Sequence, residues 1–348
     1  MITKYTKTLQ NGQDLTLEEM SVGMDELLSD KISDSEKAEF LKNLSKKGET
    51  DDEIYAMLNE LDRHGIHISP ACKGTIIDVC GTGGDKLQTF NISTTAAFVI
   101  AASGGVVAKH GNRSVSGISG SADIFEYFGY DLNAPPEKIT KIIEKFGIGF
   151  MFAQKFHPSM KNVANARKIV GARTVFNLLG PLCNPAQVKN QLIGVFSEEY
   201  LERIIRILKK RGAQNVMTVH SNDGLDELST TGKNKICFLK NNKTETMIID
   251  PEKFGLHKST IKDIQISSKN QAIQAFLSVL NGTANRSMTE ITILNAAGGL
   301  MVSNIAENFG DAIEISRQAI KNEKAYSLLT DFVKSCGQIE KLKEAETL

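Results

Sequence analysis

An apolar run from Thr75 to Cys80 leads directly into residues 81–85, which read Gly-Thr-Gly-Gly-Asp. A strand that ends in three glycines within four positions can adopt unusual backbone angles, and its consecutive N–H groups can converge on an anion. The polar segment Asn91 to Thr95 then offers an N-cap ahead of Ala96 to Ala102, so the positive end of a helix dipole would face the same place. The spacing therefore predicts a phosphate-binding unit of strand, loop and helix.

Apolar stretches of strand length alternate with helical stretches along the rest of the chain. The expected strands are Thr75–Cys80, Val106–Ala108, Ile148–Phe152, Leu192–Phe196 and Val216–His220, and the expected helices between them are Ser93–Ala102, Ala122–Phe128, Pro136–Phe146 and Glu198–Arg211. This alternation predicts an α/β domain whose central, mostly parallel sheet is covered by helices. Residues 237–249, with Asn241-Asn242 as the turn, predict a hairpin at one edge, and helices resume from Asn270.

The first 70 residues have a purely helical pattern. Apolar residues at helical spacing follow three Ser/Thr-x-x-Glu capping boxes, which begin at Thr16, Ser33 and Thr50. The change of period near residues 70–75 predicts a small all-helical domain, residues 1–72, with part of residues 160–190 packed on it. Residues 73–348 are expected to form the large α/β domain.

The composition disfavours several classes of protein. The 348 residues include 41 Lys plus Arg against 41 Asp plus Glu, and a net charge of zero does not suit a protein that binds the nucleic-acid backbone. The five cysteines are scattered without Cys-x-x-Cys spacing, which disfavours a disulfide framework and a zinc site. The longest purely apolar run is too short to span a membrane. Because the first residues lack the apolar core of a signal peptide, we expect a cytoplasmic protein.

A second polar loop follows the apolar run Val106 to Ala108. Residues 109–123 combine two cations with several serines and glycines, and Ser121 is placed to cap the helix expected at Ala122. Donor-rich loops at the carboxyl end of a strand are where open α/β sheets bind ligands. We interpret the segment as a second phosphate loop, with an ordinary surface loop as the alternative.

A third cluster, residues 220–228, follows the strand expected at Val216–His220. Adjacent Asp226 and Glu227, with Asp223 nearby, supply hard oxygen ligands, too few for a calcium cage but suited to Mg²⁺ that is shared with substrate phosphates. A solvated acidic turn is the alternative. Beside two phosphate loops, metal binding is the favoured interpretation.

These three segments, together with Phe156–Lys161 and Arg173–Pro185, resemble the anthranilate phosphoribosyltransferases of tryptophan biosynthesis. The likeness extends from the helical start to Leu294-Asn-Ala-Ala-Gly near the end. It implies a homodimeric enzyme with a nucleoside phosphorylase/phosphoribosyltransferase-like fold, in which the α/β domain binds 5-phosphoribosyl 1-pyrophosphate and the substrates meet between the two domains. It also implies dependence on Mg²⁺, with two ions.

The resemblance assigns roles to residues of this chain. The pyrophosphate and ribose would be held by Gly81, Gly84, Asp85, Thr89, Asn91, Ile92, Ser93 and Thr94. The second loop would close over phosphate oxygens with Lys109, His110, Gly111, Asn112, Arg113, Ser114, Val115, Ser116, Gly117 and Ser121. Ser93, Asp226 and Glu227 would bind the metal ions, and Lys109, Asp226 and Glu227 would be catalytic. Asn112 and Arg167 match the anthranilate contacts of the family, although Arg167 alone would be interpreted as a solvated helix charge.

The implied reaction explains these residue types. Displacement of pyrophosphate from the anomeric carbon passes through an oxocarbenium-like transition state, and a metal ion and Lys109 would stabilise the charge on the leaving group. The anthranilate amine is a neutral nucleophile, for which positioning matters more than prior deprotonation, so we assign no general base. Two residues depart from the family pattern: Phe156 stands where a histidine is common, and Gln154 where a proline is usual.

Three other functions stay open. A phosphoribosyltransferase with another aromatic acceptor would use the same loops. A pyrimidine nucleoside phosphorylase of related fold would use inorganic phosphate, and Asp226 and Glu227 would then have little purpose. A non-enzymatic relative that binds nucleic acid should show surplus basic charge and a broken glycine-rich loop, and the sequence has neither.

Overall fold

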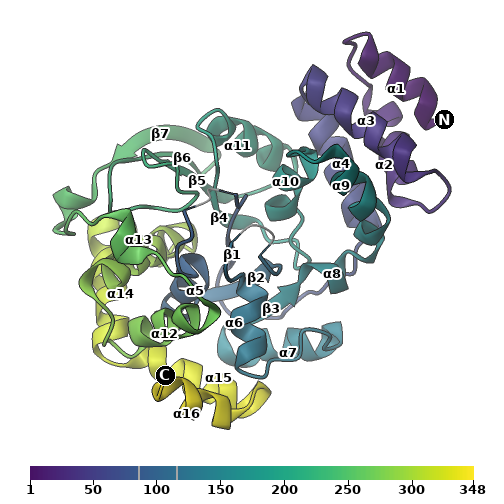
Figure 1. The fold of residues 1–348 in the computed structure, drawn as a ribbon. Helices are drawn as coiled ribbons and strands as arrows, with labels where there is room; N and C mark the ends of the chain where they lie inside the picture. The colour runs from purple at the N-terminus through teal and green to yellow at the C-terminus, as the bar shows by residue number, and fades with distance from the viewer. Residues whose placement is uncertain (85–86, 115–116) are drawn as a thin grey trace.

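The chain folds into a helical bundle and a larger part built around a sheet, as the ribbon in Figure 1 shows. The computed structural model describes residues 1–84, 87–114 and 117–348. No helix within these ranges is long and apolar enough to cross a membrane.

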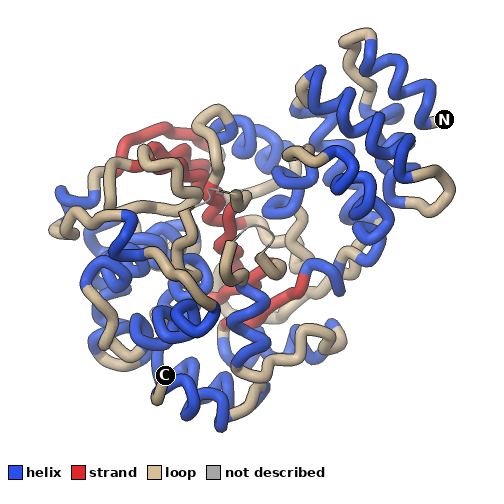
Figure 2. The backbone as a smooth tube through the Cα atoms, viewed as in Figure 1, coloured by secondary structure: helices blue, strands red, loops and turns tan. Residues whose placement is uncertain are grey.

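Seven strands form one sheet at the centre of the larger part, drawn in red in Figure 2. They are β1 Ile76–Gly81, β2 Val106–Gly111, β3 Ile148–Phe152, β4 Asn190–Gly194, β5 Asn215–Ser221, β6 Asn234–Lys240 and β7 Lys243–Ile249. Their order is β3-β2-β1-β4-β5-β6-β7. The pairs among the first five are parallel, whereas β5–β6 and β6–β7 are antiparallel. The predicted mostly parallel sheet with a hairpin at its edge is confirmed.

The hairpin turns at Asn241 and Asn242, whose φ angles are 51° and 62°. Two successive left-handed residues match the twist of paired antiparallel strands, and asparagine tolerates this conformation. Several strand boundaries differ from the prediction, by one residue at the ends of β1 and β5 and by two residues at the start of β4. β2 continues to Gly111, and β4 ends two residues early because the backbone N–H of Phe196 donates to the Thr82 hydroxyl at 3.1 Å instead of continuing the strand.

Helices cover both faces of the sheet (Figure 2). One face packs against α5 Ile92–Ala102 and α13 Arg286–Val302, and the opposite face packs against α7 Pro136–Phe146 and α11 Tyr200–Lys210. Successive strand residues alternate between the two cores: Leu192 of β4 belongs to the first apolar cluster and its neighbour Ile193 to that of the other face. The sheet therefore has a buried core on each side.

The remaining elements of the larger part are mostly helical. Helices resume at Lys269, close to the predicted Asn270. The other elements are α6 Ser121–Tyr127, α8 Ala153–Phe156, α12 Lys269–Leu280, α14 Phe309–Lys321, α15 Lys324–Cys336, α16 Ile339–Glu346 and the short 3₁₀ segments η1 Pro158–Val163, η2 Gly180–Leu182, η3 Pro251–Phe254 and η4 Ile261–Ile264.

Four helices form the N-terminal bundle: α1 Ile2–Gln10, α2 Leu17–Leu28, α3 Asp34–Lys47 and α4 Asp51–Arg63. All three predicted capping boxes are present, at the starts of α2, α3 and α4. The helix α1 was not predicted because it lacks a side-chain cap. Two later helices complete the bundle core, since α3 packs on α9 Ala164–Val170 and α4 packs on α10 Val175–Leu179.

Ion pairs join the bundle to the sheet-containing part. Arg203 and Arg206 of α11 both bind the Asp51 carboxylate at 2.9 Å, and Lys210 binds Asp52 at 2.7 Å. These pairs link α11 to the N-terminus of α4.

Candidate active site

The sequence-predicted loops meet at the carboxyl ends of the parallel strands. Strands are added on one side of β1 and then, from β4 onward, on its other side, so β1 and β4 flank a point where the strand order reverses. Ligands of open α/β sheets bind in the crevice beside such a point. The glycine-rich loop follows β1, the second loop follows β2, and the acidic cluster follows β5.

Asp226 lies directly against the glycine-rich loop. Its Oδ2 accepts a hydrogen bond from the backbone N–H of Gly83 at 2.6 Å. A Cβ atom on Gly81 would overlap the Asp226 carboxylate, and one on Gly194 would overlap the Asp226 backbone. The absence of a side chain at Gly81 and Gly194 therefore leaves the space that Asp226 occupies between β1 and β4. Gly194 was missed in the sequence, where the only signal is a glycine near the end of an apolar strand.

Asp223 braces this acidic turn. Its carboxylate accepts hydrogen bonds from Ser221, Thr231 and Ser229, and from the backbone N–H of Leu225 at 2.9 Å. Burial acts to raise the pKa of Asp223, but the three hydroxyl hydrogen bonds together lower it. Because its oxygens accept these hydrogen bonds, Asp223 shapes the turn that carries Asp226.

Lys109 lies on the floor of the site. It belongs to β2 rather than to the loop, and its side chain is 1% exposed. Its Nζ donates to the carbonyl of Val79 at 2.6 Å and to the hydroxyl of Ser93 at 3.3 Å. Burial lowers the pKa of the ammonium, while the carboxylates of Asp78 and Glu227 act in the opposite direction. Lys109 thus contacts Ser93 and feels the charges of Asp78 and Glu227.

Asp78 is a functional candidate that is absent from the predicted site residues. It is a fully buried carboxylate in the middle of β1 and accepts hydrogen bonds from Asn184 Nδ2 at 2.7 Å and from the backbone N–H of His110 at 3.2 Å. Burial raises its pKa, and the charge of Lys109 opposes that shift. A single acid inside an apolar strand was the available signal, because such a group needs a partner.

His110 follows Lys109 in β2, and its ring lies against that of His157, with the ring centroids 5.3 Å apart. Burial, followed by the charges of His157 and Lys109, lowers the pKa of His110 to about 3. The His157 Nε2 lies 2.9 Å from the carbonyl of Cys183. His110 is therefore a neutral ring in the wall of the site.

The second loop contacts the start of α5. Thr94 donates its hydroxyl to Ser121 Oγ at 3.0 Å, and Asn91 Nδ2 donates to the carbonyl of Ser119 at 3.2 Å. The prediction that Ser121 caps α6 was wrong, since Ser121 is the first helical residue and Gly120 occupies the cap. Asp123 accepts the Gly120 N–H instead, at 2.8 Å.

Other predicted residues of this loop have protein partners. Arg113 forms a two-point ion pair with Glu126 at 2.6 and 2.7 Å, so its charge is largely neutralised. Asn112 Oδ1 accepts from Gln154 Nε2 at 3.3 Å, and Ser114 Oγ accepts from the Gly117 N–H at 2.7 Å. Gly111 ends β2. The predicted site residues Asp85, Val115 and Ser116 lie outside the described residues.

The remaining predicted donor-site residues lie around the start of α5. Ile92 is buried in the apolar core, so only its backbone is available to a ligand. Thr89 pairs with Gln265 in an isolated bridge, and the Gly84 carbonyl accepts a hydrogen bond from Arg173 at 2.6 Å.

Arg167 lies on α9, the helix that packs on the bundle. Its guanidinium carbon is 5.6 Å from the ring centroid of Phe176, and burial lowers its pKa. Phe156, by contrast, is fully buried in an apolar cluster with Ile68 and Met151. Its ring is therefore enclosed by apolar side chains and is not available to a ligand.

Several buried polar atoms near these segments have no hydrogen-bond partner within the described part of the chain. They are Asn91 Oδ1, His110 Nε2, His157 Nδ1, Ser159 Oγ and Thr174 Oγ1. Buried polar atoms are normally paired with protein, water or ligand. The unpaired nitrogens of the adjacent His110 and His157 rings are therefore places where water or a polar ligand can bind.

Two family descriptions match this chain. Residues 3–65 match the helical bundle domain of the glycosyl transferase family, and residues 73–326 match its a/b domain.

Relatives and solved structures agree. The anthranilate phosphoribosyltransferase of Nitrosopumilus maritimus is 61% identical over 99% of both chains, and that of Cenarchaeum symbiosum is 48% identical over 97% of this chain and 98% of its own. The crystal structure of the Thermus thermophilus enzyme is 34% identical with a TM-score of 0.88, covering 94% of this chain and 98% of that one. A Saccharomyces cerevisiae enzyme in complex with PRPP and Mg is 25% identical with a TM-score of 0.87, covering 96% and 97%. The chain therefore belongs to the anthranilate phosphoribosyltransferase family.

Proposed function

We propose that this chain transfers the phosphoribosyl group of 5-phosphoribosyl 1-pyrophosphate to the amine of anthranilate, forming N-(5-phosphoribosyl)anthranilate and pyrophosphate. The observation that carries the proposal is the position of Asp226. The N–H of Gly83 holds its carboxylate against Gly81, at the point where the strand order of the sheet reverses. A fixed carboxylate beside a phosphate-type loop suits a metal–pyrophosphate substrate.

Mg²⁺ fits the donor atoms of this site. Asp226 and Glu227 offer carboxylate oxygens and Ser93 offers a hydroxyl, all of which are hard ligands that Mg²⁺ prefers. We propose two ions, held by these three residues together with substrate oxygens. When bound, Mg²⁺ would neutralise charge that develops on the departing pyrophosphate.

The donor would be bound by backbone and cationic groups. The N–H groups of the glycine-rich loop and the first turn of α5 can hold phosphate oxygens, with Gly81, Gly84, Thr89, Asn91, Ile92, Ser93 and Thr94 as the contacts described here. Asp85 and loop residues 109–117 and 121 complete the proposed set. Lys109, buried beside Ser93, would stabilise the leaving group from the floor of the site.

The acceptor would be oriented by Arg167 and Asn112. Arg167 has no ion-pair partner in the described ranges, so its guanidinium can pair with the anthranilate carboxylate. Asn112 is itself positioned by Gln154 and can align the ortho amine. Orientation of a neutral amine toward the anomeric carbon is the main requirement on this side. A yeast relative was solved in complex with 4-fluoroanthranilate, which supports an aromatic amine acid as the acceptor.

Three further features are part of this proposal. We propose a bundle domain of residues 1–72, completed by part of 160–190, and a donor-binding domain of residues 73–348. We also propose a cytoplasmic homodimer. Light scattering tests the dimer, since one chain has a mass of 38.1 kDa.

The activity is tested by the loss of anthranilate fluorescence when protein, 5-phosphoribosyl 1-pyrophosphate and MgCl₂ are mixed. We expect signal loss that EDTA abolishes and that the double variant Asp226→Ala, Glu227→Ala lacks while staying folded. Glu198→Gln, which alters an exposed acid paired with Lys235, is the matched control. Turnover of other aromatic amines but not anthranilate, or phosphorolysis of a pyrimidine nucleoside, would replace the proposal with one of the two alternative enzymes.

A further inference from the structure

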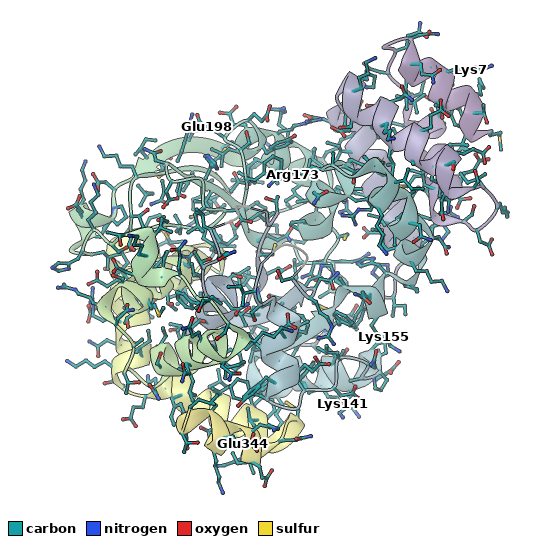
Figure 3. All side chains as sticks on the ribbon, in the orientation of Figure 1. Lys7, Lys141, Lys155, Arg173, Glu198 and Glu344 are labelled. Carbon is teal, nitrogen blue, oxygen red and sulfur yellow. The ribbon has the colours of Figure 1, made fainter. Side chains whose placement is uncertain are left out.

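Arg173 connects the acceptor side of the site to the glycine-rich loop. It lies in the short connection between α9, which carries Arg167, and α10, and Figure 3 labels it between the sheet-containing part and the bundle. Its Nη2 donates to the carbonyl of Gly84 at 2.6 Å. A side chain from the bundle side of the molecule thus touches the loop proposed to bind the donor.

The position of this guanidinium is fixed by the loop itself. Its carbon lies 3.9 Å from the ring centroid of Phe196, a close cation–π contact. The N–H of Phe196 donates to the Thr82 hydroxyl at 3.1 Å, and the N–H of Thr82 donates to the carbonyl of Gly194 at 3.0 Å. The ring on which Arg173 rests is therefore tied to the glycine-rich loop and to the end of β4.

Gly84 is shaped to receive the cation. Its φ of +84° lies in the left-handed region, and a Cβ there would come within 2.5 Å of Arg173 Nη2. A side chain at position 84 would therefore both strain the backbone and displace the Arg173 guanidinium.

The charge of Arg173 is also unusual for this chain. Every other arginine of the chain except Arg167 forms an ion pair with a carboxylate of the described residues. The paired arginines are Arg63, Arg113, Arg203, Arg206, Arg211, Arg286 and Arg317. Arg173 forms none within the described ranges and is exposed. A guanidinium has five N–H donors, and the Gly84 carbonyl takes one of them. Arg167 is proposed to pair with the acceptor carboxylate, so Arg173 is the second guanidinium of the described residues whose charge is available to a substrate anion.

We propose that Arg173 binds the pyrophosphate group of the donor substrate, while its hydrogen bond to Gly84 holds the glycine-rich loop in place. The inference rests on the proposed function and assigns to the donor a residue that comes from the acceptor segment. Binding of pyrophosphate and placement of Arg167 would then be linked through the five residues that separate the two arginines.

Calorimetric titration of the full chain with inorganic pyrophosphate and MgCl₂ tests the inference without catalysis. Arg173→Ala should bind pyrophosphate about ten- to a hundredfold more weakly than wild type, the usual cost of a lost charge-assisted hydrogen bond. Arg173→Lys should lose less than Arg173→Gln, because lysine keeps the charge whereas glutamine can keep only a donor for Gly84. Arg206→Ala, an exposed arginine paired with Asp51, is the matched control and should bind like wild type.

Steady-state kinetics supply the second measurement. The Michaelis constant for 5-phosphoribosyl 1-pyrophosphate should rise in Arg173→Ala while that for anthranilate changes little. Pyrophosphate binding within twofold of wild type in Arg173→Ala, or full recovery in Arg173→Gln, would overturn the proposed anion contact. If wild type binds magnesium pyrophosphate but does not consume anthranilate, the proposed function fails, and the binding series still decides the role of Arg173.

Discussion

Asn295 holds both backbone groups of Leu228. Its Oδ1 accepts the Leu228 N–H at 3.0 Å and its Nδ2 donates to the Leu228 carbonyl at 2.7 Å, across a separation of 67 residues. Leu228 directly follows Asp226 and Glu227. A buried amide on α13 therefore fixes the backbone that presents both proposed metal ligands.

Asn295→Ala should lower both stability and metal affinity. The change leaves two buried backbone groups unpaired, at a cost of about 1 to 3 kcal/mol each, and frees the turn that carries Glu227. Urea unfolding measures the first effect, and the Mg²⁺ concentration for half-maximal activity measures the second. Thr292→Val is the control, because it removes a buried hydroxyl that bonds only within α13, to Met288. An unchanged Mg²⁺ requirement in a folded Asn295→Ala protein would contradict this role.

The sequence was informative where local rules decide the structure. The capping boxes at Thr16, Ser33 and Thr50 and the Asn241-Asn242 turn depend on neighbouring residues, and all of them form as predicted. The extension of β2 through Lys109 was missed because a buried lysine is stabilised by distant groups, the Val79 carbonyl and the Asp78 charge.

The parts of the site that escaped prediction depend on contacts between distant segments. Gly194 makes room for Asp226, and Arg173 reaches Gly84, across separations that no local pattern encodes. Ser121 satisfied the residue preference for a cap, but Thr94 and the Gly120–Asp123 hydrogen bond placed the cap one residue earlier. Motif spacing thus identified which segments meet, and packing decided which atoms face each other.

Gly81→Ala should remove most activity with a modest loss of stability, about 1 to 3 kcal/mol. The added methyl group would overlap the Asp226 carboxylate and push it out of its place against the Gly83 N–H. Gly232→Ala is the control, since its Cβ would meet only Asn222 at an ordinary 3.9 Å. Turnover and thermal unfolding of both variants check the expectation, and a fully active Gly81→Ala enzyme would mean that the Asp226 position is not critical.

Arg167→Ala should raise the Michaelis constant for anthranilate about ten- to a hundredfold, because the acceptor carboxylate loses its cation. The constant for the donor should change little. Lys168→Ala removes an exposed cation one residue away and serves as the control. Equal anthranilate constants for wild type and Arg167→Ala would show that Arg167 is only a helix charge resting on Phe176.

Phe156→His, which restores the residue common in the family, should destabilise this protein by about 2 to 4 kcal/mol. Phe156 is buried among apolar side chains, so an imidazole there would lack a hydrogen-bond partner. Phe156→Leu keeps the site apolar and should cost less than about 1.5 kcal/mol. Urea unfolding of the two variants compares the costs, and a Phe156→His protein as stable as wild type would mean that the cluster admits a polar ring.

Acid should destabilise the fold through His110. In the unfolded chain this ring ionises at its ordinary pKa of 6.5. In the folded protein, burial of the ring and then the charges of His157 and Lys109 lower its pKa to about 3. Between pH 6.5 and 3 the unfolded state therefore binds a proton that the folded state does not bind. The free energy of unfolding falls as the pH drops through this range, by up to about 1.4 kcal/mol per pH unit. His157 adds to the slope, since burial lowers its pKa as well. Urea unfolding across this pH range should give a shallower slope for His110→Gln than for wild type. Parallel slopes for the two proteins would mean that His110 takes up its proton in the folded state.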